Sequence, residues 1–354
     1  MERIKVGVLG ASGAVGQRIV SLLIDHPWFE IGALGGSERA AGRPYGELLR
    51  PAALGSAASR PLPAALAETV VQATHPSGFA GCRLIFSALP AEVAHTVEPA
   101  FAQAGFGVVS NASSFRMAED VPLMIPEANA DHLALIARQR ESRGWRGFIV
   151  TNPNCSTIHL TLALAPLHEA FGLAAVQVTT MQAISGAGLR GVAGLDIIDN
   201  VVPYIGGEED KLEHEPQKLL GRLADDGIAP ASFVVSAQCN RVATTDGHLE
   251  SVAVRFKQPA DIEAVRAAWR EWRPLSGRGL PSAPDPPIIL RDEPDRPQPR
   301  LDRDVAGGMA SVVGRLRPDP ILDYKFSVLG HNLVRGAAGG VVLIAELLHA
   351  EEWV

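Results

Sequence analysis

Short apolar runs alternate with stretches of helical periodicity over the first 150 residues of the chain. The apolar runs have the length and composition of buried strands and lie at residues 4–9, 31–34, 83–88 and 107–110. Apolar residues at helical spacing follow the first and third runs, at residues 17–24 and 93–103. Strands that alternate with helices predict a parallel, doubly wound α/β sheet, whose ligand lies at the carboxyl ends of the strands.

The pattern changes after a further strand-like run that begins at Phe148. An apolar helix is predicted from Cys155 to about Phe171, and Pro166 is expected to kink or shorten it. Longer runs with strand character then follow at residues 175–183, 233–238, 249–256 and 309–316. These runs predict a second, α+β domain with a largely antiparallel sheet.

Three other segments have weaker patterns. The Ala-rich residues 51–66 predict a surface connection, and residues 285–300, rich in proline and charge, predict an extended loop that would suit a subunit interface. Residues 332–348 predict a long helix that packs back on the first domain. The expected domains are residues 1–150, completed by a C-terminal helix at 331–354, and residues 151–330.

The composition of the chain narrows the class of protein. A length of 354 residues suits two domains, and a net charge of −7 with mixed signs provides no basic face for nucleic acid. The chain has no stretch of about 18 uncharged apolar residues and no apolar signal segment near its start. We therefore expect a soluble, cytoplasmic protein, for which small anionic ligands remain possible.

A glycine-rich turn joins the first predicted strand to the first predicted helix. Residues 10–16 (GASGAVG) would expose backbone N–H groups at the positive end of the helix dipole, where a pyrophosphate can bind. The alternative is a strand-to-helix turn that binds nothing. The expected dinucleotide contacts in this turn are Gly10, Ser12, Gly13, Ala14 and Val15.

Residues after the second and third strands bear on the choice of dinucleotide. Ser37 and Arg39 suit a 2′-phosphate and favour NADP, whereas Glu38 between them could contact a ribose hydroxyl and favour NAD. Ser87, which ends the third apolar run, is expected beside the same ligand. NADP is therefore the predicted cofactor, with NAD as the alternative.

The three cysteines are Cys82, Cys155 and Cys239, and their spacing suggests neither a disulfide framework nor a metal site. Cys82, just before an apolar strand, is interpreted as a small hydrophobic residue. Cys155 differs, because the first turn of a helix lowers a thiol pKa toward the thiolate. Asn154 and Ser156 could supply donors for an oxyanion. The alternative for Cys155 is a buried structural cysteine.

Residues 152–157 (NPNCST) are similar to the active-site signature of aspartate-semialdehyde dehydrogenases. Further matches to this family cover almost the whole chain, at residues 10–16, 110–117 (SNASSFRM), 182–188 (QAISGAG), 206–211 (GGEEDK), 246–248 (DGH) and 332–339 (NLVRGAAG). Residues 297–303 (PQPRLDR) resemble the archaeal and fungal branch, whereas residues 113–117 look more like the bacterial one. The resemblance implies a Rossmann-type domain followed by a catalytic and dimerisation domain.

The family also implies roles for individual residues. His248 would be the acid–base partner of Cys155, because an imidazole can take up and return a proton near neutral pH. The implied substrate-binding residues are Arg116 and Lys211 for phosphate, Glu208 for the ammonium, Arg241 for the carboxylate, and Gln182 and Asn154 beside the acyl group. The implied nicotinamide contacts are Ser185, Gly186 and Asn332. Without the family, Glu208 and Lys211 would equally suit a solvated helix face.

The implied reaction is the NADPH-dependent conversion of L-aspartyl 4-phosphate to L-aspartate 4-semialdehyde through a thioester on Cys155, by a homodimer or homotetramer. Relatives with the same cysteine and histidine could instead reduce N-acetylglutamyl phosphate or an acyl-CoA. Glu208 and Arg241 separate these alternatives, because a free amino acid needs both partners. A third alternative is a dinucleotide-binding sensor without catalytic activity.

Overall fold

The first sheet is parallel, and the point at which its strand order changes direction lies beside the first strand of the chain. The computed structural model describes residues 3–49, 61–188, 191–225 and 227–354. The strand order is β3-β2-β1-β4-β5-β6, and every pairing is parallel. The strands are β1 Ile4–Leu9, β2 Phe29–Gly36, β3 Gln72–Ala73, β4 Leu84–Ser87, β5 Gly107–Ser110 and β6 Phe148–Thr151. The chain turns to opposite sides after β1 and β4, so a crevice for a ligand opens at their carboxyl ends.

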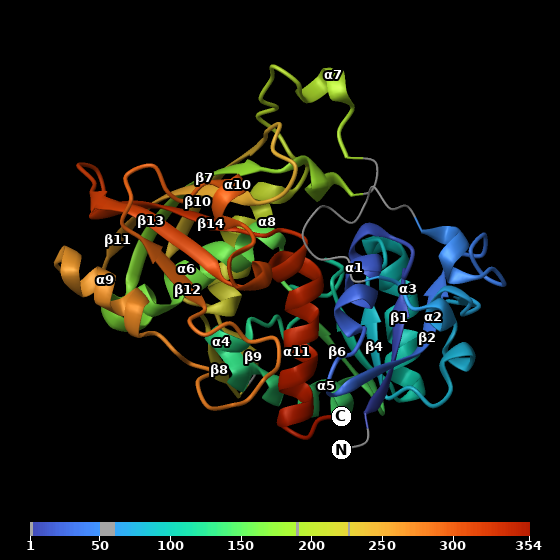
Figure 1. Ribbon diagram of the computed structural model, residues 1–354. Helices are drawn as coiled ribbons and strands as arrows, with labels where there is room; N and C mark the ends of the chain where they lie inside the picture. The colour runs from blue at the N-terminus through green and yellow to red at the C-terminus, as the bar shows by residue number, and fades with distance from the viewer. Residues whose placement is uncertain (1–2, 50–60, 189–190, 226) are drawn as a thin grey trace.

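Helices cover both faces of this sheet, which explains why its strands are apolar without alternation. Phe86 of β4 packs in the same apolar cluster as α1 (Ala14–Leu23) and α11 (Gly339–Ala350). Its neighbour Ile85 packs on the other face with Phe101 of α3 (Ala91–Ala104). The predicted return of the C-terminal helix to the first sheet is confirmed, and Figure 1 shows α11 beside that sheet.

The second sheet is mixed and has the order β10-β7-β11-β14-β13-β12. Its three central pairings are antiparallel, as predicted, and its two outer pairings are parallel. The strands are β7 Leu173–Gln182, β10 Val234–Arg241, β11 His248–Phe256, β12 Ile288–Arg291, β13 Ser311–Pro318 and β14 Tyr324–Gly330, and a separate hairpin pairs β8 Arg222–Ala224 with β9 Gly227–Ala229. The apolar faces of these strands form one core with α6, α8 and α9.

Helix α6 (Cys155–Phe171) leads from the last strand of the first sheet into the core of the second. The expectation that Pro166 shortens this helix is wrong, because α6 continues to Phe171. Burial of almost the whole helix outweighs the lost hydrogen bond. The remaining helices are α2 Ala64–Ala67, α4 Pro126–Asn129, α5 Leu135–Arg143, α7 Gly194–Ile197, α8 Glu208–Leu219, α9 Ile262–Glu271 and α10 Pro299–Asp302.

The expectation of a plain loop at residues 285–300 is wrong. The apolar residues 288–291 form β12, which pairs with β13, and two cis peptides, Asp285-Pro286 and Arg296-Pro297, flank the strand. The prolines lie beside this edge strand and not within it, so they remove none of its hydrogen bonds to β13. The proline-rich composition of the segment therefore led to the prediction of a loop where a short strand exists. Of the Ala-rich segment 51–66, residues 51–60 lie outside the described residues, and α2 occupies part of the rest.

An arm that contains α7 projects from the second half of the molecule (Figure 1). Four of its apolar side chains are exposed: Leu195, Ile198, Val201 and Tyr204. Apolar surface of this kind on a projecting segment is typical of an interface with another chain. Among the described residues, no helix is long and apolar enough to cross a membrane.

Glu250 on β11 is a fully buried acid, and neither of its carboxyl oxygens has a hydrogen-bond partner among the described residues. Burial raises the pKa of this carboxyl well above its ordinary value. The folded state therefore keeps a proton that the unfolded chain loses above pH of about 4.3, and this acid destabilises the fold increasingly as pH rises.

Replacement of Glu250 by leucine should raise the free energy of unfolding at pH 8 by about 1–3 kcal/mol, because a buried unsatisfied polar group is removed. The gain should be smaller at pH 4, where the unfolded carboxyl is also protonated. Urea unfolding at both pH values measures the difference, and Glu250→Gln is the control that removes only the titration. A leucine variant less stable than the wild type at pH 8 would show that the buried carboxyl does not destabilise the fold.

Candidate active site

The turn that begins α6 holds Cys155 at the end of the first sheet. Strand β6 ends at Thr151, and Asn154 is the N-cap of α6. The Asn154 Oδ1 accepts the backbone N–H groups of Ser156 at 2.9 Å and Thr157 at 3.2 Å. This cap fixes the first helical turn and confirms the predicted placement of Cys155 after a strand and at the start of a helix.

A cavity of about 330 Å³ opens beside Cys155. It brings together residues from both halves of the chain: Cys155, Arg116, Asn154, Gln182, Glu208, Lys211 and Arg241, with Gly186, Asn332 and Val15 from the predicted cofactor set. The structure therefore collects every predicted substrate residue on the walls around the thiol.

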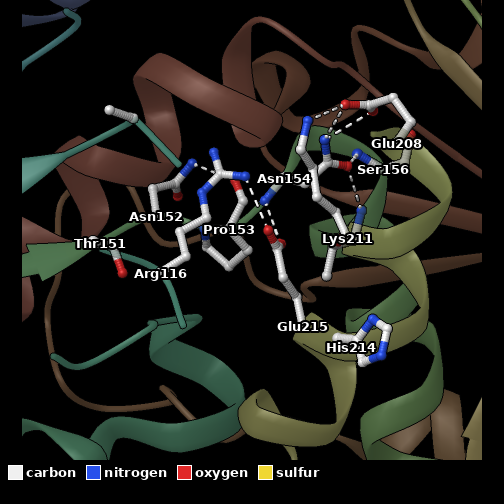
Figure 2. Close-up of polar contacts among 12 residues, drawn as sticks. Arg116, Thr151, Asn152, Pro153, Asn154, Ser156, Glu208, Lys211, His214 and Glu215 are labelled. Carbon is white, nitrogen blue, oxygen red and sulfur yellow. Dashed lines mark hydrogen bonds and ion pairs between the residues drawn. The ribbon is translucent and has the colours of Figure 1, made fainter. Parts of the chain in front are cut away.

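Glu208, the first residue of α8, is the centre of a polar network on the cavity wall (Figure 2). Its carboxylate accepts from Asn154 Nδ2 at 3.0 and 2.9 Å, from Lys211 Nζ at 2.7 Å and from Gln182 Nε2 at 3.3 Å. Burial opposes ionisation, but these donors together hold the pKa of Glu208 below its usual value. Glu208 is therefore ionised, and the Asn154 amide donates to it rather than standing ready for an oxyanion as expected.

Arg116 is held by a residue that the motifs did not indicate. Its Nη1 donates to Glu215 Oε1 at 3.0 Å, and its Nη2 donates to the Asn111 carbonyl at 3.0 Å. The other Glu215 oxygen accepts the backbone N–H of Asn154 at 2.7 Å. Glu215 lies two helical turns after Glu208 on α8, and therefore on the same face of the helix. This spacing was the feature of the sequence that could have identified Glu215 as a residue of the site.

Lys218, one turn further along α8, is a second buried charge that the sequence motifs did not indicate. Its Nζ donates to the carbonyl oxygens of Arg116, Ala118 and Val121 at 2.7, 2.7 and 2.8 Å. Burial lowers the pKa of Lys218 to about 8. Glu208, Lys211, Glu215 and Lys218 thus form one polar stripe along α8.

The expectation that the helix terminus lowers the pKa of the Cys155 thiol is wrong for this structure. Cys155 lines the cavity and keeps some exposure, but the surrounding protein encloses its thiol. Burial, followed by the charge of Glu208, raises the pKa to about 12, against Arg116, the Ser156 N–H and Arg241, which lower it. The thiol is therefore protonated, because burial and Glu208 outweigh the donors at the helix terminus.

His248 begins β11 and is completely buried. Its Nδ1 lies 3.0 Å from the backbone nitrogen of Ala183, which can only donate. The neutral ring therefore carries its proton on Nε2, which has no partner among the described residues. Burial, followed by the charges of Arg241 and His331, lowers the pKa of His248 to about 3, so the ring is neutral.

Two glycines allow close contacts at the cavity wall. A Cβ on Gly186 would lie 2.7 Å from Arg241 Nη1, so a side chain there would displace the guanidinium; His248, 3.4 Å from the same point at Nε2, lies behind this wall and does not line the cavity. A Cβ on Gly336 would lie 2.8 Å from the Cβ of Cys155. Gly336 belongs to a π-helix, Val334–Ala338, a distortion that is frequent at functional sites.

The glycine turn lies where a dinucleotide would need it. Gly10 follows β1, and Gly13 is the N-cap of α1 but supplies no side-chain cap, so the first amides of α1 are offered to a ligand. Ser12 and Ala14 flank Gly13 in this turn, and Val15 lines the cavity.

The other predicted cofactor residues differ in their exposure. Ser37 and Arg39 are exposed after β2, whereas Ser87 is fully buried at the end of β4. Only the strand-end position of Ser87, and not an accessible hydroxyl, supports its predicted role. Asn332 donates to Ser185 Oγ at 2.9 Å and accepts the Gly247 N–H at 2.9 Å, which joins the nicotinamide candidates to the turn before His248.

A parallel sheet with a glycine turn, beside a cavity lined by a cysteine at a helix start, indicates a dinucleotide-dependent oxidoreductase. Comparison with known proteins gives the family. The descriptions "Semialdehyde dehydrogenase, NAD binding domain" and "Semialdehyde dehydrogenase, dimerisation domain" match residues 5–136 and 164–335. The chain is 51% identical to the aspartate-semialdehyde dehydrogenase of Archaeoglobus fulgidus over 99% of each protein.

Solved structures agree with this match. The aspartate-semialdehyde dehydrogenase of Candida albicans, crystallised with NADP, is 45% identical and superimposes with a TM-score of 0.90 over 99% of this chain and all of that one. Enzyme II of Vibrio cholerae is 27% identical, with a TM-score of 0.77 over 99% of both chains. The chain belongs to the aspartate-semialdehyde dehydrogenase family, and it resembles the archaeal and fungal proteins more than this bacterial one.

The raised thiol pKa predicts a distinctive alkylation profile. Without substrate, the rate of Cys155 alkylation by iodoacetamide should rise about tenfold per pH unit from pH 7 to 10, because only the thiolate reacts. Peptide mapping by mass spectrometry separates this reaction from alkylation of Cys82 and Cys239. A rate that levels off near neutral pH would show that the thiol is already ionised.

Proposed function

We propose that the protein reduces L-aspartyl 4-phosphate to L-aspartate 4-semialdehyde with NADPH, releases phosphate and thereby supplies the synthesis of lysine, threonine, methionine and isoleucine. The observation that carries this proposal is the set of charges around one thiol: a buried carboxylate and three cations line the Cys155 cavity. An amino acid with an acyl phosphate has the complementary charges.

Each charged group of the substrate has a partner on the cavity wall. Glu208 binds the ammonium, and Arg241 binds the α-carboxylate, with Gln182 beside the acyl group. Arg116 and Lys211 bind the phosphate. An N-acetylated amino acid has no ammonium for Glu208, and an acyl-CoA needs no phosphate site, so the wall favours the free amino acid over both rivals.

NADP is the cofactor, and its proposed contacts are the residues at the carboxyl ends of the first sheet. The amides of the glycine turn would hold the pyrophosphate, Ser37 and Arg39 would hold the 2′-phosphate, and Asn332 with Ser185 would lie beside the nicotinamide. When bound there, NADPH supplies the hydride that reduces the thioester.

The covalent step uses Cys155. Its sulfur forms a bond to the acyl carbon, the carbon–oxygen bond to phosphate breaks, and phosphate leaves toward Arg116 and Lys211. Arg116, the Ser156 N–H and Arg241 lower the pKa of the thiol against burial and Glu208, and they stabilise the thiolate that attacks. The thiol proton leaves to solvent.

His248 acts as a hydrogen-bond donor to the substrate oxygen. Its Nε2–H donates to the oxyanion that develops when the thioester is reduced. Uptake of a second proton would place an N–H at Nδ1 against the Ala183 N–H, so the imidazolium form requires that backbone contact to break. The neutral ring can therefore donate without any rearrangement, whereas proton uptake for an acid–base role requires the contact with Ala183 to break.

The wider organisation follows from the fold. We propose a dinucleotide-binding domain at residues 1–150 with the C-terminal helix 331–354, and a catalytic and dimerisation domain at 151–330. The exposed apolar side chains of the α7 arm support assembly with further copies as a homodimer or homotetramer. The proposed compartment is the cytoplasm.

An assay with aspartate semialdehyde, phosphate and NADP tests the function in the reverse direction. NADP reduction should require phosphate and should exceed NAD reduction. Cys155→Ser should lower kcat by roughly four or more orders of magnitude, the scale for loss of a nucleophile, and His248→Ala by about 10²–10³-fold, the scale for loss of one oxyanion donor. NADP reduction that proceeds with CoA and without phosphate would assign the chain to the acyl-CoA alternative.

A further inference from the structure

We propose that Glu215 is a positioning residue that fixes Arg116 relative to the Cys155 turn and thereby sets the affinity for phosphate. This inference rests on the proposed function, in which Arg116 binds the phosphate. Glu215 is absent from the cavity lining, whereas Arg116 and Cys155 are part of it. Glu215 therefore makes no direct contact in the cavity, and it can position the substrate only through the residues that it holds.

Each carboxylate oxygen of Glu215 accepts a hydrogen bond from a different residue. Oε1 accepts from Arg116 Nη1 at 3.0 Å, and Oε2 accepts from the Asn154 N–H at 2.7 Å. Figure 2 shows both bonds as dashed lines that meet at the Glu215 carboxylate. Glu215 and Arg116 are 2% and 7% exposed, so water cannot readily replace either bond. One side chain thus joins the predicted phosphate site to the residue before the nucleophile.

Only a carboxylate can make this bridge. A backbone N–H can only donate, and a guanidinium has five N–H groups and no acceptor. Glu215 therefore faces a donor at each oxygen. A glutamine has the same shape, but its amide nitrogen would meet one of these donors. Glu215→Gln must lose one bond of the bridge and places two donors in contact.

The backbone at Arg116 is held from the same helix. Lys218, one turn after Glu215, donates to the Arg116 carbonyl and to the carbonyls of Ala118 and Val121. Arg116 is thus fixed by α8 at both its main chain and its side chain, while further N–H groups of the guanidinium remain for an anion. Loss of the Glu215 bridge frees the side chain and leaves the backbone clamp intact.

The test compares two identical substitutions on α8. Glu213→Gln is the control, because Glu213 accepts a single backbone N–H, from Ala237 at 3.0 Å, and a glutamine carbonyl can keep that bond. Both variants lose one negative charge. The phosphate KM is measured in the reverse assay with saturating aspartate semialdehyde and NADP. We expect Glu215→Gln to raise it about tenfold, the loss of one charge-assisted bond, and Glu213→Gln to leave it unchanged.

The KM values for aspartate semialdehyde and NADP should change less than about twofold in Glu215→Gln, a split that general loosening of the fold would not produce. An unchanged phosphate KM would overturn the inference. A lower one would also overturn it, because Glu215 would then only be neutralising Arg116. If Glu215→Gln does not fold, Glu215→Asp decides: its shorter carboxylate reaches one donor, and a wild-type phosphate KM would contradict the positioning role.

The assay separates this inference from the proposed function. If the wild-type protein shows no phosphate-dependent reduction of NADP, the proposed function fails. If the wild type depends on phosphate and Glu215→Gln has the same phosphate KM, only the positioning role fails.

Discussion

The start of α6 depends on carboxylates from a neighbouring helix. Glu208 accepts the side-chain amide of Asn154, and Glu215 accepts its backbone N–H. Asn154 in turn caps the first amides of α6, directly before Cys155. Both carboxylates belong to α8. This helix therefore fixes the positions of three parts of the site: the nucleophile, the predicted ammonium site and the predicted phosphate site. Displacement of α8 would disturb all three together.

The Cys155 thiol and the His248 ring are both neutral, although charged residues line the cavity. Burial and Glu208 keep the Cys155 thiol protonated, and the Ala183 N–H fixes the proton of a neutral His248 on Nε2. The Ala183 carbonyl also accepts from Arg241 at 2.8 Å, so the main chain of one residue orients both side chains. Arg116, Arg241 and the Ser156 N–H are the groups that lower the thiol pKa, so ionisation of the thiol depends on them.

Sequence patterns predicted the apolar elements of the core. Strands β1 and β5 matched their predicted bounds because helices bury both of their faces, whereas β3 has two residues and β12 lies among prolines. Motifs located Cys155, but Glu215 and Lys218 on a polar helix resemble solvated residues. Their burial arises only where α8 packs against the Arg116 loop. The thiol pKa was misjudged for the same reason, since enclosure by distant segments cannot be inferred from helix position.

The proposed mechanism requires that the Cys155 sulfur becomes acylated during turnover. Acylation can be read from the mass of protein that has been mixed with aspartate semialdehyde and NADP in the absence of phosphate, acid-quenched and digested. We expect one aspartyl group on the peptide that contains Cys155, with one equivalent of NADPH formed. An adduct on Cys82 or Cys239, or NADPH formation that leaves every cysteine unmodified, would contradict the mechanism.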